Sequence, residues 1–144
     1  MWISLFFLFL IVIIVLSMIC QVNMNERDYI INIKKNLDNI SHRYHSHNST
    51  GDELQYNLII SKKEVYTENH RNIYLVLWNE KSKRYYDNNT IMYAAIHELA
   101  HVISPSHDHQ PPFDNVERSL FHIAKELNYY VPTDSLDPDY PCRD

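Results

Sequence analysis

Hydrophobic side chains dominate the start of the chain, where the first twenty residues, MWISLFFLFLIVIIVLSMIC, carry no charge. As a helix rising about 1.5 Å per residue, the run from Trp2 to Cys20 would be about 28 Å long, close to the roughly 30 Å hydrocarbon core of a bilayer. It lacks the basic start and the small residues before the cut that a cleaved signal peptide shows. The pattern predicts an uncleaved transmembrane anchor over residues 1–21 and a single-pass membrane protein.

The residues after this run indicate which side of the membrane the remaining chain would occupy. Arg27, Lys34 and Lys35 weakly favour the cytosol, because basic residues close to a membrane span are enriched on that side. N-x-S/T sequons would favour the lumen, but asparagine is so frequent in this chain that such matches arise by chance. With only two cysteines, Cys20 and Cys142, the chain has no disulfide framework that requires an oxidising compartment. A cytosolic domain is therefore slightly favoured.

Beyond this first run the apolar positions recur at helical spacing and then give way to polar residues. Within NERDYIINIKKNLDNI the spacing predicts an amphipathic helix over residues 26–40 that packs on the rest of the protein. The segment SHRYHSHNSTGDE, residues 41–53, contains turn formers and the only glycine, and is expected to be a loop. His42, His45 and His47 lie in it and could bind a metal, although a polar histidine-rich loop without fixed geometry is more often solvated.

Strands are expected where β-branched and aromatic residues become frequent. Residues 54–61 and 72–78 have this composition and are bounded by polar stretches, and a short third strand is expected at 65–67. The polar stretch 79–89 then leads to the next helix, and its last residues, Asp-Asn-Asn, are suitable N-caps. The centre of the chain is therefore predicted to be a small sheet followed by helices.

Two helices are expected after the strands. The first spans about 90–103 and must end near Ser104, because Pro105 disfavours helical geometry in the residue before it. The second begins at Pro111-Pro112 and carries one apolar stripe, which is expected to face the core. The tail from 129 to 144 contains three prolines and several acidic residues, and is expected to be irregular.

Charge argues against one class of partner. The chain has a net charge of −5 and a pI of about 5.9. Its longest groups of basic residues, such as Lys34-Lys35 and residues 81–84, are too small to form a phosphate-binding face. The sequence therefore gives no support to nucleic-acid binding.

The helix over 90–103 carries the motif HExxH as His97-Glu98-Leu99-Ala100-His101. Histidines at i and i+4 project from one face of a helix, so both can reach one zinc ion at about 2.0 to 2.1 Å. Glu98 follows one position round the helix, where it can hold a zinc-activated water and take its proton. These residue types at this spacing are typical of zinc metallopeptidases.

A catalytic zinc site needs a third protein ligand and an open fourth position. His107 and His109 are both close enough in sequence to fold back onto the metal. His107 has the spacing of HExxHxxGxxH metzincins, but Ser104 replaces the turn glycine and no methionine follows the motif. A glutamate ligand of the thermolysin type would have to be Glu117 or Glu126, and neither lies in an ExxxD arrangement. Spacing alone leaves both histidines open.

The chain from "NIYLVLW" through "YYDNNTIMYAAIHELAHVISPSHDHQPPF" to "ELNYYVPTDSLDPDYPC" resembles the WLM-type metallopeptidases, particularly the small membrane-anchored members encoded by large DNA viruses. In that family the helix begins with YDxNT, carries HELAHV, and is followed by a third histidine four residues before a phenylalanine. His109 and Phe113 match this H-x-x-x-F pairing, whereas Asp108 and Asp114 depart from the glycine and the aromatic residue that members often have there. The resemblance covers residues 72–142 and favours His109 as the third ligand, with His107 as the alternative.

The resemblance implies a zincin-like α+β fold, with a small sheet, an active-site helix carrying HExxH and a following helix. The metallopeptidase core would cover residues 54–144, with 22–53 packed on it and the transmembrane anchor before both. A protein or peptide substrate would pair in extended form with the edge strand, expected at 73–78, so that its scissile bond lies over the zinc.

The expected function is that of a membrane-anchored zinc metalloendopeptidase. His97, His101 and His109 would bind Zn²⁺, and Glu98 would be the general base for peptide-bond hydrolysis. Tyr140 is a candidate for stabilising the oxyanion, although aromatic residues in a tail more often pack. The alternative is a catalytically inactive, zinc-stabilised membrane interaction module. Glu98 argues against it, because a structural site needs no base and is usually closed by a fourth protein ligand.

Overall fold

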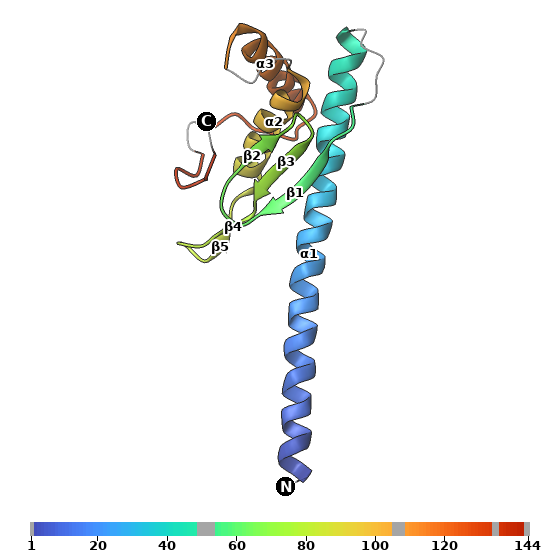
Figure 1. Cartoon of the computed structure of the whole chain (residues 1–144), viewed down its shortest axis with the longest axis vertical. Helices are drawn as coiled ribbons and strands as arrows, with labels where there is room; N and C mark the ends of the chain where they lie inside the picture. Colours follow the sequence, from blue (N-terminus) through green and yellow to red (C-terminus); the bar gives the residue numbers. More distant parts are fainter. Residues whose placement is uncertain (1, 49–53, 105–108, 134–135, 143–144) are drawn as a thin grey trace. The chain divides into compact units, whose positions relative to one another are not determined.

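The computed structural model describes residues 2–48, 54–104, 109–133 and 136–142. The elements in chain order are α1 (Trp2–Asn48), β1 (Asn57–Ser61), β2 (Tyr66–Glu68), β3 (Asn72–Val76), β4 (Trp78–Asn79), β5 (Arg84–Tyr85), α2 (Asn88–Ile103) and α3 (Pro111–Glu126) (Figure 1). The chain divides into two compact units, Met1–Asn32 and Ile33–Asp144, so α1 contributes to both. The α+β class expected from the sequence is confirmed.

The N-terminal part of α1 does not bear out the expected membrane anchor. In the part of the chain that the structure describes, no helix is both long enough and apolar enough to cross a bilayer. The prediction of a transmembrane helix over residues 1–21 is therefore wrong, and so is the single-pass membrane localisation that depended on it.

The C-terminal part of α1 belongs to the second unit and contributes to its core. Ile33, Leu37 and Ile40 are fully buried, which confirms the amphipathic helix expected over 26–40. The loop expected over 41–53 is wrong for residues 41–48, which continue the helix, and 49–53 lie outside the described residues. Ser41 is buried, so packing against the rest of the unit stabilises helix where the local composition favours turns.

The sheet that positions the site has the order β1-β3-β2. β1 pairs with β3 in parallel, and β2 pairs with β3 in antiparallel fashion with Tyr66 opposite Tyr74. The edge strand expected at residues 73–78 is therefore wrong: β3 is the central strand and β2 is an edge (Figure 1). The reason is visible in burial, because Ile73, Leu75 and Val76 are all buried, as the middle strand of a covered sheet requires.

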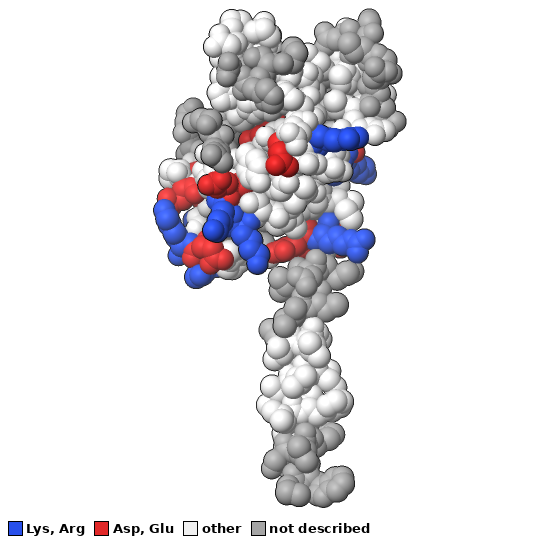
Figure 2. Space-filling model, in the orientation of Figure 1, with Lys and Arg blue, Asp and Glu red and all other residues white. Residues whose placement is uncertain are grey.

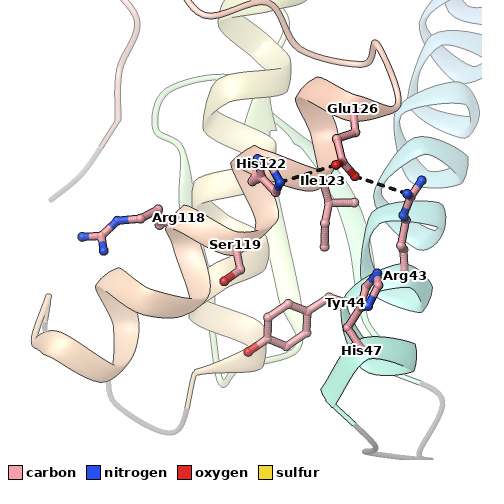
Figure 3. Close-up of a pocket in the computed structure, with 8 residues that line it drawn as sticks. All are labelled: Arg43, Tyr44, His47, Arg118, Ser119, His122, Ile123 and Glu126. Atoms are coloured by element: carbon pink, nitrogen blue, oxygen red, sulfur yellow. Dashed lines mark ion pairs between the residues drawn. The ribbon is translucent and has the colours of Figure 1, made fainter.

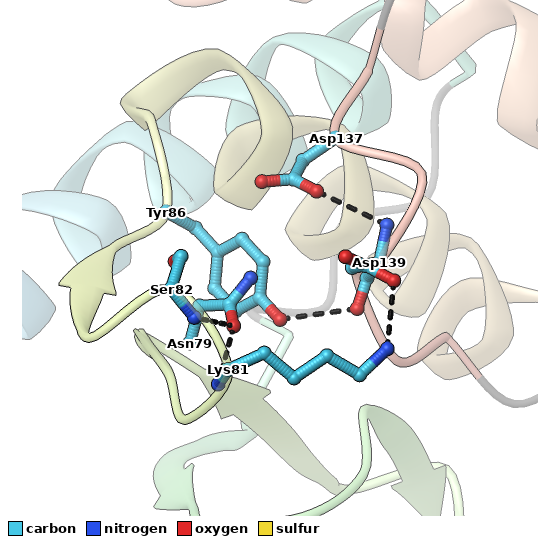
Figure 4. A network of polar contacts seen from close by, with 6 residues as sticks. All are labelled: Asn79, Lys81, Ser82, Tyr86, Asp137 and Asp139. Carbon is cyan, nitrogen blue, oxygen red and sulfur yellow. Dashed lines mark hydrogen bonds and ion pairs between the residues drawn. The ribbon is translucent and has the colours of Figure 1, made fainter.

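A two-stranded ribbon of β4 and β5 follows β3 and is tied to the C-terminal tail (Figure 4). The Asn79 side chain closes the turn by accepting the backbone amides of Lys81 and Ser82 at 2.9 and 3.1 Å. The Tyr86 hydroxyl donates to the carbonyl of Asp139 at 3.0 Å, and the Lys81 amine lies 2.9 Å from the Asp139 carboxylate. The described part of the tail is irregular, as expected, and these contacts attach it to the ribbon.

Helix α2 begins and ends close to the residues that the sequence predicted, and α3 begins where it was predicted. Asp87 caps α2 by accepting the amide of Thr90 at 2.9 Å, and the helix ends before Ser104. α3 begins at Pro111, with Gln110 as its N-cap. α2 packs against β2, β3 and α3, so most of its side chains are buried. The HExxH motif therefore lies on a helix that packs against the sheet and α3.

The surface shows no separation of charge on the face drawn in Figure 2. Basic and acidic side chains of the described residues are interspersed there, with uncharged side chains between them. Mixed signs cancel at a distance, so this face produces no large electrostatic field of one sign.

Candidate metal centre

Three histidines converge at the C-terminal end of α2. His97 and His101 come from successive turns of the helix, and their ring centroids are 5.0 Å apart. His109 precedes α3 and returns to them, with centroids 5.2 Å from His97 and 5.1 Å from His101. One nitrogen of each ring lies within 4.8 Å of the other two. The structure thus brings together His97 and His101 of the motif and His109, the third histidine that the resemblance favoured.

The spacing of these nitrogens fits a shared metal ion. Nε2 of His101 and Nε2 of His109 are 3.3 Å apart. Two nitrogens bound to one zinc at about 2.05 Å with a tetrahedral angle would be separated by about 3.3 Å. Imidazole nitrogens are also ligands that zinc prefers. The donor set and its geometry therefore suit Zn²⁺.

The ring of Phe113 packs against all three histidines of the cluster. Its ring centroid lies 5.4 Å from that of His97, 4.4 Å from His101 and 4.7 Å from His109, and only 1% of the residue is exposed. Phe113 lies in the first turn of α3, four residues after His109. The H-x-x-x-F spacing therefore brings the phenylalanine ring into contact with the third histidine. Contact with all three rings restricts their rotation and preorganises the cluster.

Glu117 orients His97 from α3. Its Oε1 lies 2.6 Å from Nδ1 of His97, so this nitrogen donates to the carboxylate and Nε2 keeps its lone pair for a metal. The hydrogen bond from His97 lowers the pKa of Glu117 despite its partial burial. From the sequence, Glu117 could be considered only as a direct ligand. Its position four residues after Phe113 on one face of α3 was the signal that it could contact the cluster.

Glu98 is almost completely buried, with 1% of the residue exposed. Burial raises the pKa of its carboxyl, while Thr67 and the charge of His97 act in the opposite direction. A carboxylate with raised proton affinity is a better proton acceptor near neutral pH. The environment of Glu98 is therefore suited to a general base.

His101 is held in the neutral form that metal binding requires. Burial lowers the pKa of His101 to about 4, and the neighbouring His97 and His109 add to this effect. A metal competes with protons for the imidazole nitrogen, so a ring that is neutral at pH 7 needs no deprotonation before it can bind.

The other candidate residues from the sequence are not found in the described cluster. His107 lies outside the described residues. His42, His45 and His47 belong to the last turns of α1 and are not part of the cluster. Tyr140 donates its hydroxyl to the carbonyl of Val76 at 3.0 Å, which gives it a structural role between the tail and β3.

Glu126 lies in a separate cavity of about 620 Å³ between α1 and α3 (Figure 3). Its carboxylate is 3.2 Å from Arg43 and 3.4 Å from His122, and both contacts are exposed. The cavity uses the face of α3 that carries Ser119 and Ile123, whereas Phe113 and Glu117 face the histidines. None of its lining residues belongs to the metal centre.

Three viral proteins are similar in sequence to this chain. Uncharacterized protein 042R of Invertebrate iridescent virus 3 is 37% identical over 57% of this chain and 52% of its own length. Uncharacterized protein R325 of Acanthamoeba polyphaga mimivirus is 37% identical over 50% of this chain and 37% of its own length. Uncharacterized protein 136R of Invertebrate iridescent virus 6 is 30% identical over 52% and 43%. The matched region thus spans about half or less of each relative.

No protein-family model matches the chain, and no solved structure matches it. These relatives are viral proteins, as are the small members of the family that the sequence resembles. The similarity does not extend to a named peptidase.

Proposed function

We propose that this protein is a zinc-dependent metallopeptidase of the WLM type with a zincin-like core. The observation that carries the proposal is the cluster of His97, His101 and His109, in which two Nε2 atoms have the 3.3 Å separation of nitrogens on one tetrahedral zinc. Glu98 follows His97 on α2, as the general base of an HExxH enzyme does. The sheet and the two helices around the cluster are the parts that a zincin-like core needs.

Each residue of the site has a distinct part in the proposed reaction. His97, His101 and His109 would hold Zn²⁺, which supplies Lewis-acid polarisation of the scissile carbonyl and the attacking water. The Glu98 carboxylate accepts a proton from this water and returns it to the leaving nitrogen. Glu117 keeps His97 in the tautomer that presents Nε2, and Phe113 holds the three rings in place.

The proposed substrate is an extended stretch of polypeptide. β2 is an edge strand beside the motif helix, and the hydroxyl of Thr67 in β2 lies 3.0 Å from the carbonyl oxygen of Glu98. A peptide that adds to an edge strand gains affinity from backbone hydrogen bonds, which do not depend on its sequence. We therefore assign to β2 the substrate-pairing role that the sequence suggested for residues 73–78.

One observation favours a second candidate, an inactive protein in which zinc only stabilises the fold. Glu98 is 1% exposed, so water can reach its carboxylate only if the surrounding groups move or if the water enters through the histidine cluster. An interaction module stabilised by zinc would need no such access. The two candidates differ in one measurable property, which is turnover.

The test compares zinc content and cleavage of a denatured protein by the full chain and three variants. Wild type should bind one zinc per chain and cleave. Glu98→Gln should keep zinc and lose cleavage, and His109→Ala should lose zinc, whereas His107→Ala should keep both. Zinc binding without cleavage by the wild type would favour the inactive module, and zinc that survives His109→Ala would reassign the third ligand.

A further inference from the structure

We propose that Thr67 and His70 are positioning residues that fix the substrate-pairing strand β2 against the metal-binding helix. The inference rests on the proposed function and extends it to residues outside the HExxH motif. Two hydrogen bonds run from the β2–β3 hairpin to the backbone of α2, and both end on carbonyls of motif residues. They set where a substrate backbone lies relative to Glu98.

The two contacts have the same sequence spacing in the hairpin and in the helix. The Thr67 hydroxyl donates to the carbonyl of Glu98 at 3.0 Å, and Nδ1 of His70 donates to the carbonyl of His101. Thr67 and His70 are three residues apart in the hairpin, and their acceptors are three residues apart in the helix. The hairpin is thus attached at two points along the turn that carries Glu98 and His101.

The His70 contact also satisfies a helix end. α2 ends at Ile103, so the carbonyl of His101 belongs to the last turn, where no amide further along the helix is available as a donor. A side chain that donates to such a carbonyl removes an unmet hydrogen bond. Loss of the His70 donor would therefore loosen both the hairpin and the helix end that holds a metal ligand.

The β2–β3 hairpin is closed by a tight turn. Asn69 and His70 have φ angles of 55° and 51°, and the amide of Arg71 donates to the carbonyl of Glu68 at 3.1 Å. Two central residues with positive φ are the signature of a type I′ turn, whose twist matches that of the paired strands. The backbone conformation at His70 is uncommon for a residue other than glycine or asparagine, so it is maintained by the turn and by the bond to His101.

The outer edge of β2 is positioned to receive a peptide next to Thr67. The amide of Val65 donates to the carbonyl of Pro141 at 2.9 Å, so this amide points away from β3. Backbone groups two residues apart on a strand point to the same side. The amide and carbonyl of Thr67 therefore face outward, toward an added strand, while its hydroxyl bonds to Glu98. One residue links the substrate backbone to the proposed general base.

The structure also limits how far a substrate can pair. Pro141 and Cys142 of the tail already lie along the edge at Val65, in a parallel bridge. Among the described residues, the tail pairs with this edge only at Val65, so an added peptide would pair from Thr67 onward. A short pairing region makes the exact placement of Thr67 more important, because few other backbone bonds are available to align the peptide.

The test measures kcat, KM and zinc content for the full chain with Thr67→Val, Thr67→Ser, His70→Leu and His70→Gln. Valine and leucine remove the donors, whereas serine and glutamine retain one. Thr67→Val should lower kcat/KM by roughly 10- to 100-fold, chiefly through kcat, because misplacement by about 1 Å has effects of this size. The zinc content of Thr67→Val should stay at the wild-type value, and Thr67→Ser should recover most of the activity. Glu80→Gln is the control, because this exposed carboxylate lies between β4 and β5 and pairs with Lys83 instead of contacting β2 or α2.

Several outcomes would overturn the inference. Wild-type kcat/KM in Thr67→Val and His70→Leu would show that the two hydrogen bonds to α2 do not position the substrate. The peptidase proposal would not be affected by that result. A loss of activity that Thr67→Ser does not rescue would mean that Thr67 acts through packing only. If circular dichroism shows that Thr67→Val is unfolded, the comparison of His70→Leu with His70→Gln tests the inference instead. Activity that persists in Glu98→Gln would instead overturn the proposed function, and the inference with it.

Discussion

Removing the carboxylate of Glu117 should weaken zinc binding although Glu117 does not contact the metal position directly. In the structure its Oε1 accepts a hydrogen bond from Nδ1 of His97 at 2.6 Å, and this bond leaves Nε2 as the metal-facing atom. In Glu117→Ala the imidazole can rotate or take the other tautomer. The ligand set then has to be reorganised before it can bind a metal.

The size of the effect follows from the environment of the pair. The side chains of His97 and Glu117 are 13% and 24% exposed, so water screens this contact less than a surface ion pair. A hydrogen bond to a charged group contributes about 1.5 to 3 kcal/mol. Loss of a partner that orients a metal ligand typically costs about 10- to 100-fold in affinity, which corresponds to about 1.4 to 2.7 kcal/mol. We expect Glu117→Ala in the upper part of this range and Glu117→Gln, which can still accept a hydrogen bond, in the lower part.

The assay is competition for zinc against a chromophoric chelator at pH 7.5, with the full chain. Glu126→Gln is the matched control, because Glu126 lies on the same helix and pairs with Arg43 and His122 instead of the cluster. Its affinity should equal that of the wild type. If Glu117→Ala bound zinc within about twofold of the wild type, the orienting role would be refuted.

Three further predictions concern stability. Phe113→Ala should destabilise the fold by about 3 to 5 kcal/mol in urea unfolding, since it empties a buried aromatic site, and it should also weaken zinc binding. Tyr140→Phe should cost about 1 kcal/mol, since it removes the hydrogen bond to Val76. Partial burial raises the pKa of Asp87, but hydrogen bonds from Thr90 outweigh this and leave it below its ordinary 3.8. The stabilisation is present above that value and is lost as pH falls through the lowered pKa, so the wild type should lose stability below about pH 4, whereas Asp87→Asn should lose less.

Local rules were sufficient for the motif helix. The cap at Asp87, the stop before Pro105 and the placement of His97 and His101 on one face depend only on neighbouring residues in the sequence. The start of α3 at Pro111 is of the same kind. These features were predicted because each depends on interactions within one or two helical turns.

Local rules failed where a distant part of the chain decides the outcome. The polar residues 41–48 were predicted to be a loop, but packing against the rest of the second unit keeps them in α1. β3 has the composition of either an edge or a central strand, and its position became clear only once β1 and β2 were seen on both sides of it. The apolar start of the chain predicted a membrane anchor, yet no described helix is long and apolar enough to be one.

The sequence by itself determined the chemistry of the site: two histidines and a glutamate on one helical turn, with further histidines close behind. Only the tertiary structure decided that His109 reaches them, that Glu117 and Phe113 support the cluster, and that Thr67 and His70 attach β2 to it. The physical reason is the range of the interactions. Helical periodicity acts over four residues, whereas the return of His109 and the docking of β2 depend on how α2, α3 and the sheet bury their apolar faces together.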